Sequence, residues 1–233
     1  MENENYLVAT IKPWNIKVYN ESIKHYKGKW HLITEATELT ADKIKSINPK
    51  YIFFPHWSNI VPSEILDIAT CVCFHETDLP YGRGGSPLQN LITCGHKETF
   101  VTALKMSKEL DAGPIYLKKP LSSEGLAEEI FVRTANIVAE MIKIIITENP
   151  KPKEQVGEST LFKRRTPSQS KMPTEKNTLV DIFDHIRMLD AESYPKAFLE
   201  SDGFRYEISR PALKTCEILA DVRITKIEGD SND

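Results

Sequence analysis

The sequence predicts an α/β protein built on a mostly parallel sheet with flanking helices, followed by a small C-terminal α+β subdomain. Three observations support this fold class. Short apolar runs alternate with amphipathic stretches over about the first 150 residues, as in repeated strand–helix units. Two of these runs, residues 51–54 and 71–74, are unbroken, which is typical of parallel strands buried on both faces. The composition then changes to a segment rich in Pro, Lys, Ser and Thr.

The first half of the chain predicts strands and helices in alternation. Strands are expected at residues 6–11, 30–34, 51–54 and 71–74. Apolar residues at helical spacing predict a helix over residues 15–26. Thr40 is expected to cap a second helix that runs to Ile47, because its hydroxyl can accept a hydrogen bond from the first turn.

The second half completes the main domain and adds the tail. Two further strands are expected at residues 100–106 and 114–117, and a long helix at 123–148. Residues 148–176 lack an apolar period and predict a surface linker, with residues 160–162 docked on the main domain. The tail predicts a helix at 179–189, a hairpin at 195–209, a strand at 218–227 and a frayed end at 229–233. The expected organisation is a main domain over residues 1–150, a linker over 151–176 and a subdomain over 177–233.

The composition limits the classes of function. The 233 residues hold 30 Lys+Arg against 33 Asp+Glu, a formal net charge of −3, whereas a protein that neutralises nucleic-acid phosphates needs a basic excess. No apolar run reaches the roughly 18 residues that a membrane span needs. The first residues are acidic and polar where a signal peptide is basic and then apolar, so we expect a cytoplasmic protein. Cys71 and Cys73 are expected to be reduced core thiols, and no residue spacing predicts a metal site.

The candidate site is where the strand at residues 71–74 ends. His75 follows this strand directly and leads into a loop rich in Gly and Pro, at the strand end where open α/β sheets bind ligands. Asp111 lies in a turn between two predicted strands on the same side. Taken singly, His75 fits a structural role and Asp111 fits an ordinary turn. Together, an imidazole and a carboxylate at one sheet edge can tune each other and move a proton, so the two predict a catalytic pair.

The motif that starts at His75 resembles a known enzyme family. The pattern is His75-x-x-x-Leu79-Pro80-x-x-Arg83-Gly84-Gly85-Ser86-Pro87, then Asp111-x-Gly113-Pro114-Ile115. It is similar to the formyltransferases that use 10-formyltetrahydrofolate, which include methionyl-tRNA, glycinamide ribonucleotide and sugar N-formyltransferases. The resemblance covers roughly residues 51–162.

A narrower similarity concerns two sequence segments, His56-Trp57-Ser58 and Gly84-Gly85-Ser86-Pro87-Leu88-Gln89-Asn90. Both look like the short formyltransferases that act on UDP-linked 4-amino sugars, such as the UDP-4-amino-4,6-dideoxy-L-AltNAc enzyme beside the pseudaminic-acid pathway. The resemblance implies a Rossmann-like formyltransferase fold. It also implies an enzyme that transfers a formyl group from 10-formyltetrahydrofolate, without a metal, to the amino group of a nucleotide-linked amino sugar.

The resemblance and the residue chemistry together assign the roles. In formyl transfer a neutral amine attacks the formyl carbon, and an oxyanion develops that protonated His75 can stabilise while Asp111 relays a proton. The donor is expected at the Gly- and Pro-rich loop, whose residues are Pro80, Tyr81, Gly82, Arg83, Gly84, Gly85, Leu88 and Gln89. The acceptor is expected at residues that follow the other strands; they are Trp14, Asn15, His56 and Trp57. The two tryptophans fit core or rim packing, or alternatively an aromatic wall for a sugar or uracil ring.

Two departures from the family pattern stand out. Cys73 occupies the place of the family's catalytic Asn, and a thiol cannot donate hydrogen bonds as an amide does. Asn59 or Gln89 would then supply the missing donor, or His75 and backbone N–H groups would suffice. The sequence Lys12-Pro13-Trp14-Asn15 replaces the glycine-bearing turn of the family, which predicts an unusual acceptor.

Two other interpretations stay open. The acceptor is another amine, such as an aminoacyl-tRNA or a carrier-bound aminoacyl group, although tRNA would demand a basic surface and a full C-terminal domain. Alternatively, the chain is a catalytically dead member that binds folate or nucleotide and regulates a partner. The leading expectation is a small-molecule acceptor, no nucleic-acid or membrane partner, and a possible homodimer.

Overall fold

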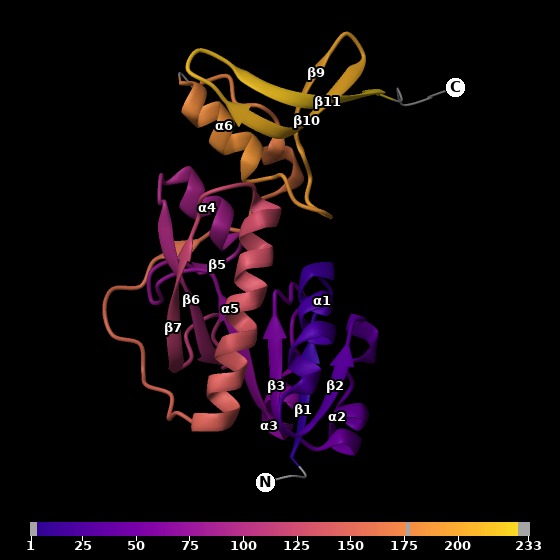
Figure 1. Cartoon of the computed structure of the whole chain (residues 1–233), viewed down its shortest axis with the longest axis vertical. Coiled ribbons are helices and arrows are strands. Elements are labelled where there is room, and N and C mark those ends of the chain that lie inside the picture. Colours follow the sequence, from indigo (N-terminus) through magenta and orange to yellow (C-terminus); the bar gives the residue numbers. More distant parts are fainter. Residues whose placement is uncertain (1–3, 176–177, 228–233) are drawn as a thin grey trace.

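The main domain is built around a six-stranded sheet in the order β2-β1-β3-β4-β6-β7 (Figure 1). The structure is a computed structural model that describes residues 4–175 and 178–227, so the predicted fraying of residues 229–233 lies outside it. The first four strands in this order pair in parallel, whereas β6 pairs antiparallel with both β4 and β7. The strands are β1 (Asn5–Ala9), β2 (Lys29–Ile33), β3 (Pro49–Pro55), β4 (Thr70–His75), β6 (Glu98–Lys105) and β7 (Ile115–Ser122).

Helices cover both faces of the sheet, which explains its unbroken apolar strands. Alternate residues of β1, β3 and β4 point to two separate cores. Val8, Phe53 and Val72 pack with α1 (Pro13–Glu21) and α5 (Ala127–Glu148). Leu7, Ile52 and Cys71 pack on the other face with α2 (Ala41–Ile47) and α3 (Ser63–Ile68). The predicted fold class is therefore confirmed.

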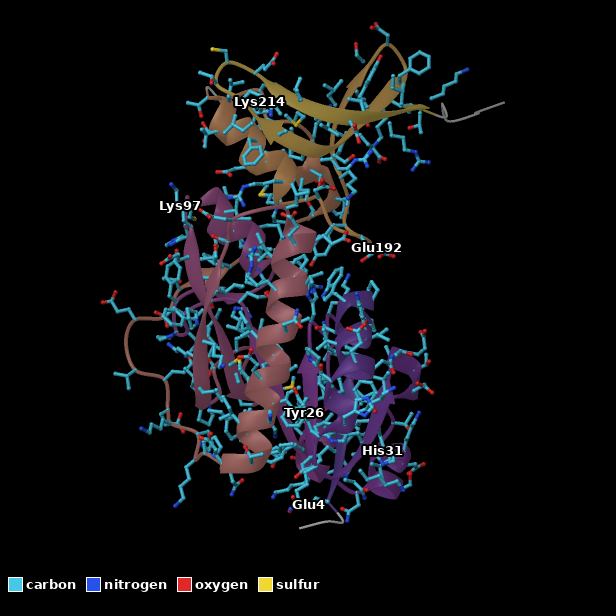
Figure 2. The ribbon with its side chains drawn as sticks, in the orientation of Figure 1. Glu4, Tyr26, His31, Lys97, Glu192 and Lys214 are labelled. Atoms are coloured by element: carbon cyan, nitrogen blue, oxygen red, sulfur yellow. The ribbon has the colours of Figure 1, made fainter. Side chains whose placement is uncertain are left out.

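The C-terminal part adds a helix and a three-stranded antiparallel sheet beyond one end of α5 (Figure 1). Its elements are a 3₁₀ helix (Pro167–Ser170), α6 (Leu179–Arg187), β9 (Ala197–Ser201), β10 (Phe204–Leu213) and β11 (Ile218–Lys226). Ile186, Met188 and Ala197 belong to the same buried cluster as α5, so this part shares a core with the main domain. Glu192 lies at the junction (Figure 2), where its N–H donates a hydrogen bond of 2.9 Å to Glu128 on α5.

Several elements differ from their predicted bounds. The helix expected at residues 15–26 ends at Glu21, and a separate 3₁₀ turn follows at Ile23–His25. The strand expected at 114–117 continues to Ser122. The added residues include two lysines, which edge strands of a sheet commonly carry, and β7 is such an edge strand. The short elements α3, α4 (Pro87–Thr93), β5 (Arg83–Gly84) and β8 (Leu161–Phe162) were not predicted as such.

The loop before β7 passes so close to β6 that Gly113 has no room for a side chain. A Cβ placed there would overlap the main-chain oxygen of Lys105. We expect Gly113→Ala to lower the free energy of unfolding by about 1–3 kcal/mol, as overpacking does, in urea titrations. Gly95→Ala is the comparison, because a Cβ at Gly95 meets no atom within 4 Å and its cost is backbone strain at φ +79° alone. An equal or smaller cost at Gly113 would contradict the overlap.

Candidate active site

His75 is the last residue of β4 and is held from one side by the loop that follows it. Its Nε2 lies 2.7 Å from the carbonyl oxygen of Gly82. Because a carbonyl can only accept, Nε2 carries the hydrogen of this bond. The other ring nitrogen, Nδ1, lies 3.7 Å from Oδ2 of Asp111. The imidazole is therefore oriented with Nδ1 toward the carboxylate, and Nδ1 is the atom that can gain or lose a proton.

Asp111 reaches this position from the loop between β6 and β7. Its backbone adopts φ +52°, a left-handed conformation that few non-glycine residues take. Its Oδ2 accepts a hydrogen bond of 2.9 Å from the backbone N–H of Gly84. Both side chains are nearly buried, with exposed fractions of 9% for His75 and 12% for Asp111. The structure thus brings together the two residues that the sequence predicted as a pair.

The segment predicted as a surface linker forms a wall of this site. We call residues 153–165 the strap. Its strand β8 pairs in parallel with β5, and the N–H groups of Arg83 and Gly85 donate to the carbonyls of Thr160 and Phe162. The Gly82 N–H donates to the hydroxyl of Thr160 at 2.7 Å. Docking was expected only for residues 160–162, but hydrogen bonds to the main domain extend back to Lys153.

The glycines of the predicted donor loop fit closely against the strap. A Cβ at Gly84 would overlap the carbonyl of Phe162, and one at Gly85 would lie 2.5 Å from Arg164. Their small size therefore serves packing against this segment. Tyr81 is half-buried, and its hydroxyl lies 3.1 Å from Nε2 of His96.

Two residues assigned to donor binding point elsewhere. Helix α4 begins at Pro87, and its first turn directs both side chains inward. Leu88 is fully buried in the core beneath α5. The Gln89 amide donates to the carbonyl of Met188 at 3.2 Å. Neither side chain faces the donor loop, and Gln89 does not replace the missing amide near His75.

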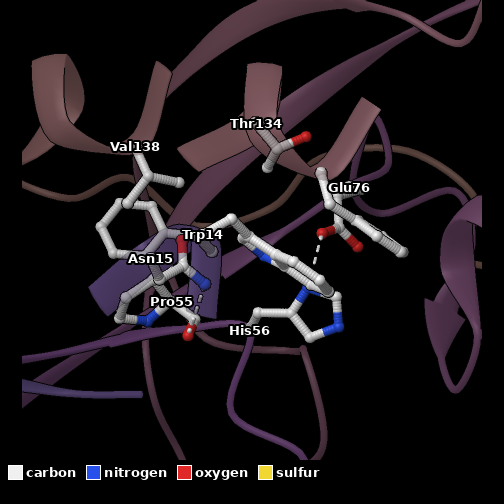
Figure 3. Close-up of a pocket in the computed structure, with 9 residues that line it drawn as sticks. Trp14, Asn15, Pro55, His56, Glu76, Thr134 and Val138 are labelled. Carbon is white, nitrogen blue, oxygen red and sulfur yellow. Dashed lines mark hydrogen bonds and ion pairs between the residues drawn. The ribbon is translucent and has the colours of Figure 1, made fainter. Parts of the chain in front are cut away.

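The residues assigned to the acceptor separate into two places. Trp14 and Asn15 are buried and line a small cavity together with His56 (Figure 3). Trp57 packs edge-on against Phe54 in the core on the other face of the sheet. The two tryptophans therefore form no common aromatic wall, because the sheet lies between them, and both pack against the core as the other interpretation predicts. Trp14 instead stacks on Phe131 of α5, with ring centroids 5.2 Å apart.

The cavity is small and partly polar. Its free volume is about 10 Å³, which holds about one water molecule and excludes a sugar ring. Its lining residues are Trp14, Asn15, Pro55, His56, Phe74, Glu76, Phe131, Thr134 and Val138. Glu76 was missed by the sequence analysis, although the alternation after Val72 and Phe74 places it on this face.

Glu76 and His56 form a second pair in this cavity, with Oε1 and Nδ1 3.8 Å apart (Figure 3). Burial, together with the charge of Asp111, raises the pKa of Glu76 to about 7. Burial also lowers the pKa of His56 to about 3, with a smaller effect from Lys12. The His56 Nε2 lies 2.9 Å from the hydroxyl of Tyr194. The cavity therefore favours the neutral form of both side chains.

Cys73 lies on β4 two residues before His75 and is half-buried. Burial, followed by the charge of Asp111, raises the pKa of its thiol, so the group stays protonated. Cys71 and Cys73 are both free thiols, as expected. Asn59, the other proposed source of an amide, is exposed in the loop after β3. Backbone N–H groups and His75 remain as donors near the site.

Comparisons with known proteins identify the family. The family model described as "Formyl transferase" matches residues 17–130, and the model of the methionyl-tRNA formyltransferase C-terminal domain matches residues 167–225. The structure of a methionyl-tRNA formyltransferase from Clostridium thermocellum is 47% identical, with a TM-score of 0.93 over 96% of this chain and 99% of that one. This chain belongs to the formyl transferase family. Members of the family are enzymes that transfer formyl groups, with 10-formyltetrahydrofolate as the donor.

More distant proteins differ in how much of the chain they match. The methionyl-tRNA formyltransferase of Thermodesulfovibrio yellowstonii is 38% identical over 130 residues, which are 51% of this chain and 41% of the relative. This match therefore spans about two fifths of the relative's length. A sugar N-formyltransferase from Shewanella sp. is 17% identical, with a TM-score of 0.67 over 91% of this chain and 99% of that one, and shows a common fold.

The described residues contain neither a metal-binding cluster nor a membrane-spanning helix. Among residues 4–175 and 178–227, no group of three or more His, Cys, Asp or Glu side chains could hold a metal ion. No helix in the same ranges is long and apolar enough to cross a membrane.

The buried carboxyl of Glu76 predicts a pH-dependent stability. Its folded pKa of about 7 exceeds the usual 4.5, so the folded protein holds a proton that the unfolded chain releases between these values. The wild type should therefore lose stability as pH rises through this window. We expect Glu76→Gln to raise the free energy of unfolding by about 2–3 kcal/mol at pH 8 and to give little gain at pH 4. The exposed Glu64→Gln is the control in the urea titrations, and a gain that does not depend on pH would contradict the prediction.

Cys73 is expected to act as an apolar filler of its strand. Cys73→Ala should then lower kcat less than about threefold and cost about 1 kcal/mol of stability, an ordinary packing loss. Cys71→Ala, at a buried thiol on the same strand, calibrates that loss. A large loss of kcat in Cys73→Ala that Cys73→Asn restores would instead assign the thiol part of the missing amide's work.

Proposed function

We propose that this protein transfers the formyl group of 10-formyltetrahydrofolate to a primary amine, and that this amine is carried by an aminoacyl-tRNA. The observation that supports the chemistry is the orientation of His75, with Nε2 bonded to Gly82 and Nδ1 facing Asp111. The pair provides a proton-carrying imidazole and a carboxylate at the edge where the family's motif residues converge.

The geometry suits the proton movements of the reaction. The neutral amine attacks the formyl carbon, a C–N bond forms, and the carbonyl electron pair moves to oxygen. Both ring N–H groups of protonated His75 face protein acceptors, so His75 stabilises this oxyanion through its positive charge. When the intermediate collapses, the bond to N10 of the folate breaks, the amine loses one proton and N10 gains one. His75 and Asp111 carry that proton between the two nitrogens.

The relatives favour the aminoacyl-tRNA acceptor over the nucleotide sugar that was first expected. The proteins named methionyl-tRNA formyltransferase are 47% and 38% identical, against 17% for the sugar enzyme. The C-terminal model of the same enzyme also matches residues 167–225. On this proposal, the expectation of no nucleic-acid partner is replaced by one of tRNA binding.

A nucleotide-linked amino sugar remains the second candidate because of the charge of the chain. The formal net charge is −3, whereas tRNA binding depends on cationic side chains that neutralise phosphates. A small acceptor makes no such demand. The two candidates therefore differ in their expected dependence on salt.

The test is an assay with 10-formyltetrahydrofolate and two acceptors, methionyl-tRNA and a UDP-linked 4-amino sugar, that follows tetrahydrofolate and the formylated product. We expect turnover with methionyl-tRNA. Its kcat/KM should fall steeply between 50 and 200 mM salt, because the slope of its logarithm against the logarithm of salt is roughly proportional to the number of phosphate contacts. Transfer to the sugar alone, with little salt dependence, would select the second candidate.

The same assay tests the catalytic pair. His75→Ala and Asp111→Asn should each lower kcat at least about 10²-fold while the fold is retained. His25→Ala, at an exposed histidine, is the control and should leave kcat unchanged. Normal turnover in either site variant would remove that residue from the mechanism.

A further inference from the structure

One side chain of the strap, Gln155, joins the donor loop to the backbone around Asp111. Its amide nitrogen donates to the carbonyls of Asp111 at 2.8 Å and Gly113 at 2.9 Å. Its amide oxygen accepts from Nε of Arg83 at 3.1 Å and from Nη2 at 2.8 Å. The amide therefore uses both of its N–H donors and both lone pairs of its oxygen.

The chemistry of this contact requires a primary amide. The guanidinium of Arg83 can only donate and the two carbonyls can only accept, so a side chain placed between them meets donors on one side and acceptors on the other. A group that accepts on one side and donates on the other satisfies both. A carboxylate of the same shape would keep the bonds to Arg83 and lose both bonds to the loop of Asp111.

Asp111 depends on such support because its conformation is unfavourable. At φ +52° a glycine would be more stable, but a glycine has no carboxylate. The Gly84 N–H fixes the carboxylate, and Gln155 fixes the main chain from which it projects. A second contact of Arg83, with Oε1 of Glu109 at 3.4 Å, holds the start of the same loop.

We propose that Gln155 is a positioning residue that couples the donor loop, through Arg83, to the carboxylate of Asp111. This inference rests on the proposed function of Asp111. A displacement of Arg83 is transmitted through one rigid amide to the backbone of Asp111. The donor loop and the proton-relaying carboxylate therefore move together.

The first test uses an isosteric substitution. Gln155→Glu should lower kcat about 10- to 100-fold, because small misplacements of reacting groups have effects of this size, and should change KM for the acceptor less than about threefold. Gln169→Glu is the matched control, since it makes the same change nearby and its side-chain oxygen still accepts from the Thr166 N–H. Equal kcat in Gln155→Glu and the control would overturn the proposal.

A double-mutant cycle separates positioning from a general structural role. If Gln155 acts through Asp111, Gln155→Glu should have no further effect on kcat in an Asp111→Asn background. A loss of the same size in both backgrounds would overturn the coupling.

A last measurement does not depend on turnover. Hydrogen exchange at the Gly84 amide, followed by NMR, should be faster in Gln155→Glu than in the wild type, because the Asp111 carboxylate that accepts this N–H is less well held. Unchanged protection of Gly84 would overturn the coupling. If the wild type transferred formyl to none of the amines, the proposed function would fail, and the exchange experiment would still decide the coupling.

Discussion

The site depends on the backbone of residues 82–84, because this short stretch orients both His75 and Asp111, the proposed catalytic pair. The Gly82 carbonyl holds one nitrogen of His75, and the Gly84 N–H holds the carboxylate of Asp111. The stretch is itself fixed by main-chain bonds to residues 160–162. The strap is therefore part of the active site although it contributes no member of the pair. A loop rich in glycine can only be a rigid template when another segment removes its freedom in this way.

Two histidine–carboxylate pairs lie on opposite faces of the sheet at the end of β4. Successive side chains of a strand point to opposite faces, so His75 lies on one side of the sheet and Glu76 on the other. His75 meets the carboxylate of Asp111 across 3.7 Å, between the loop after β4 and the loop before β7. Glu76 meets His56 in a cavity under α5, where burial favours uncharged forms of both. The charge of Asp111 raises the pKa of Glu76, so the two sites are close enough to influence each other electrostatically.

Much of the fold and the proximity of His75 and Asp111 followed from the sequence, and the omissions have physical causes. The parallel strands were predictable because burial on both faces requires continuous apolar runs, and the pair because a strand end and a turn fall at one sheet edge. The directions of the Leu88 and Gln89 side chains could not be predicted, because the start of α4 decides where they point. The role of Gln155 could not be predicted, because its partners lie 42 to 72 residues away along the chain. Gln155 itself lies in a segment with no apolar period.

The identity of the acceptor depends on which cationic side chains of the C-terminal part can contact phosphates. Arginines are present on its sheet, but several are already paired with carboxylates. Arg205 contacts Glu200 and Glu207 at 3.6 and 3.4 Å, and Arg210 pairs with Asp221. Each such pair removes a cation from the set that can neutralise phosphates, unless the nucleic acid displaces the carboxylate at a cost. On the proposed function, a tRNA acceptor would have to exchange these pairs for contacts with its own phosphates.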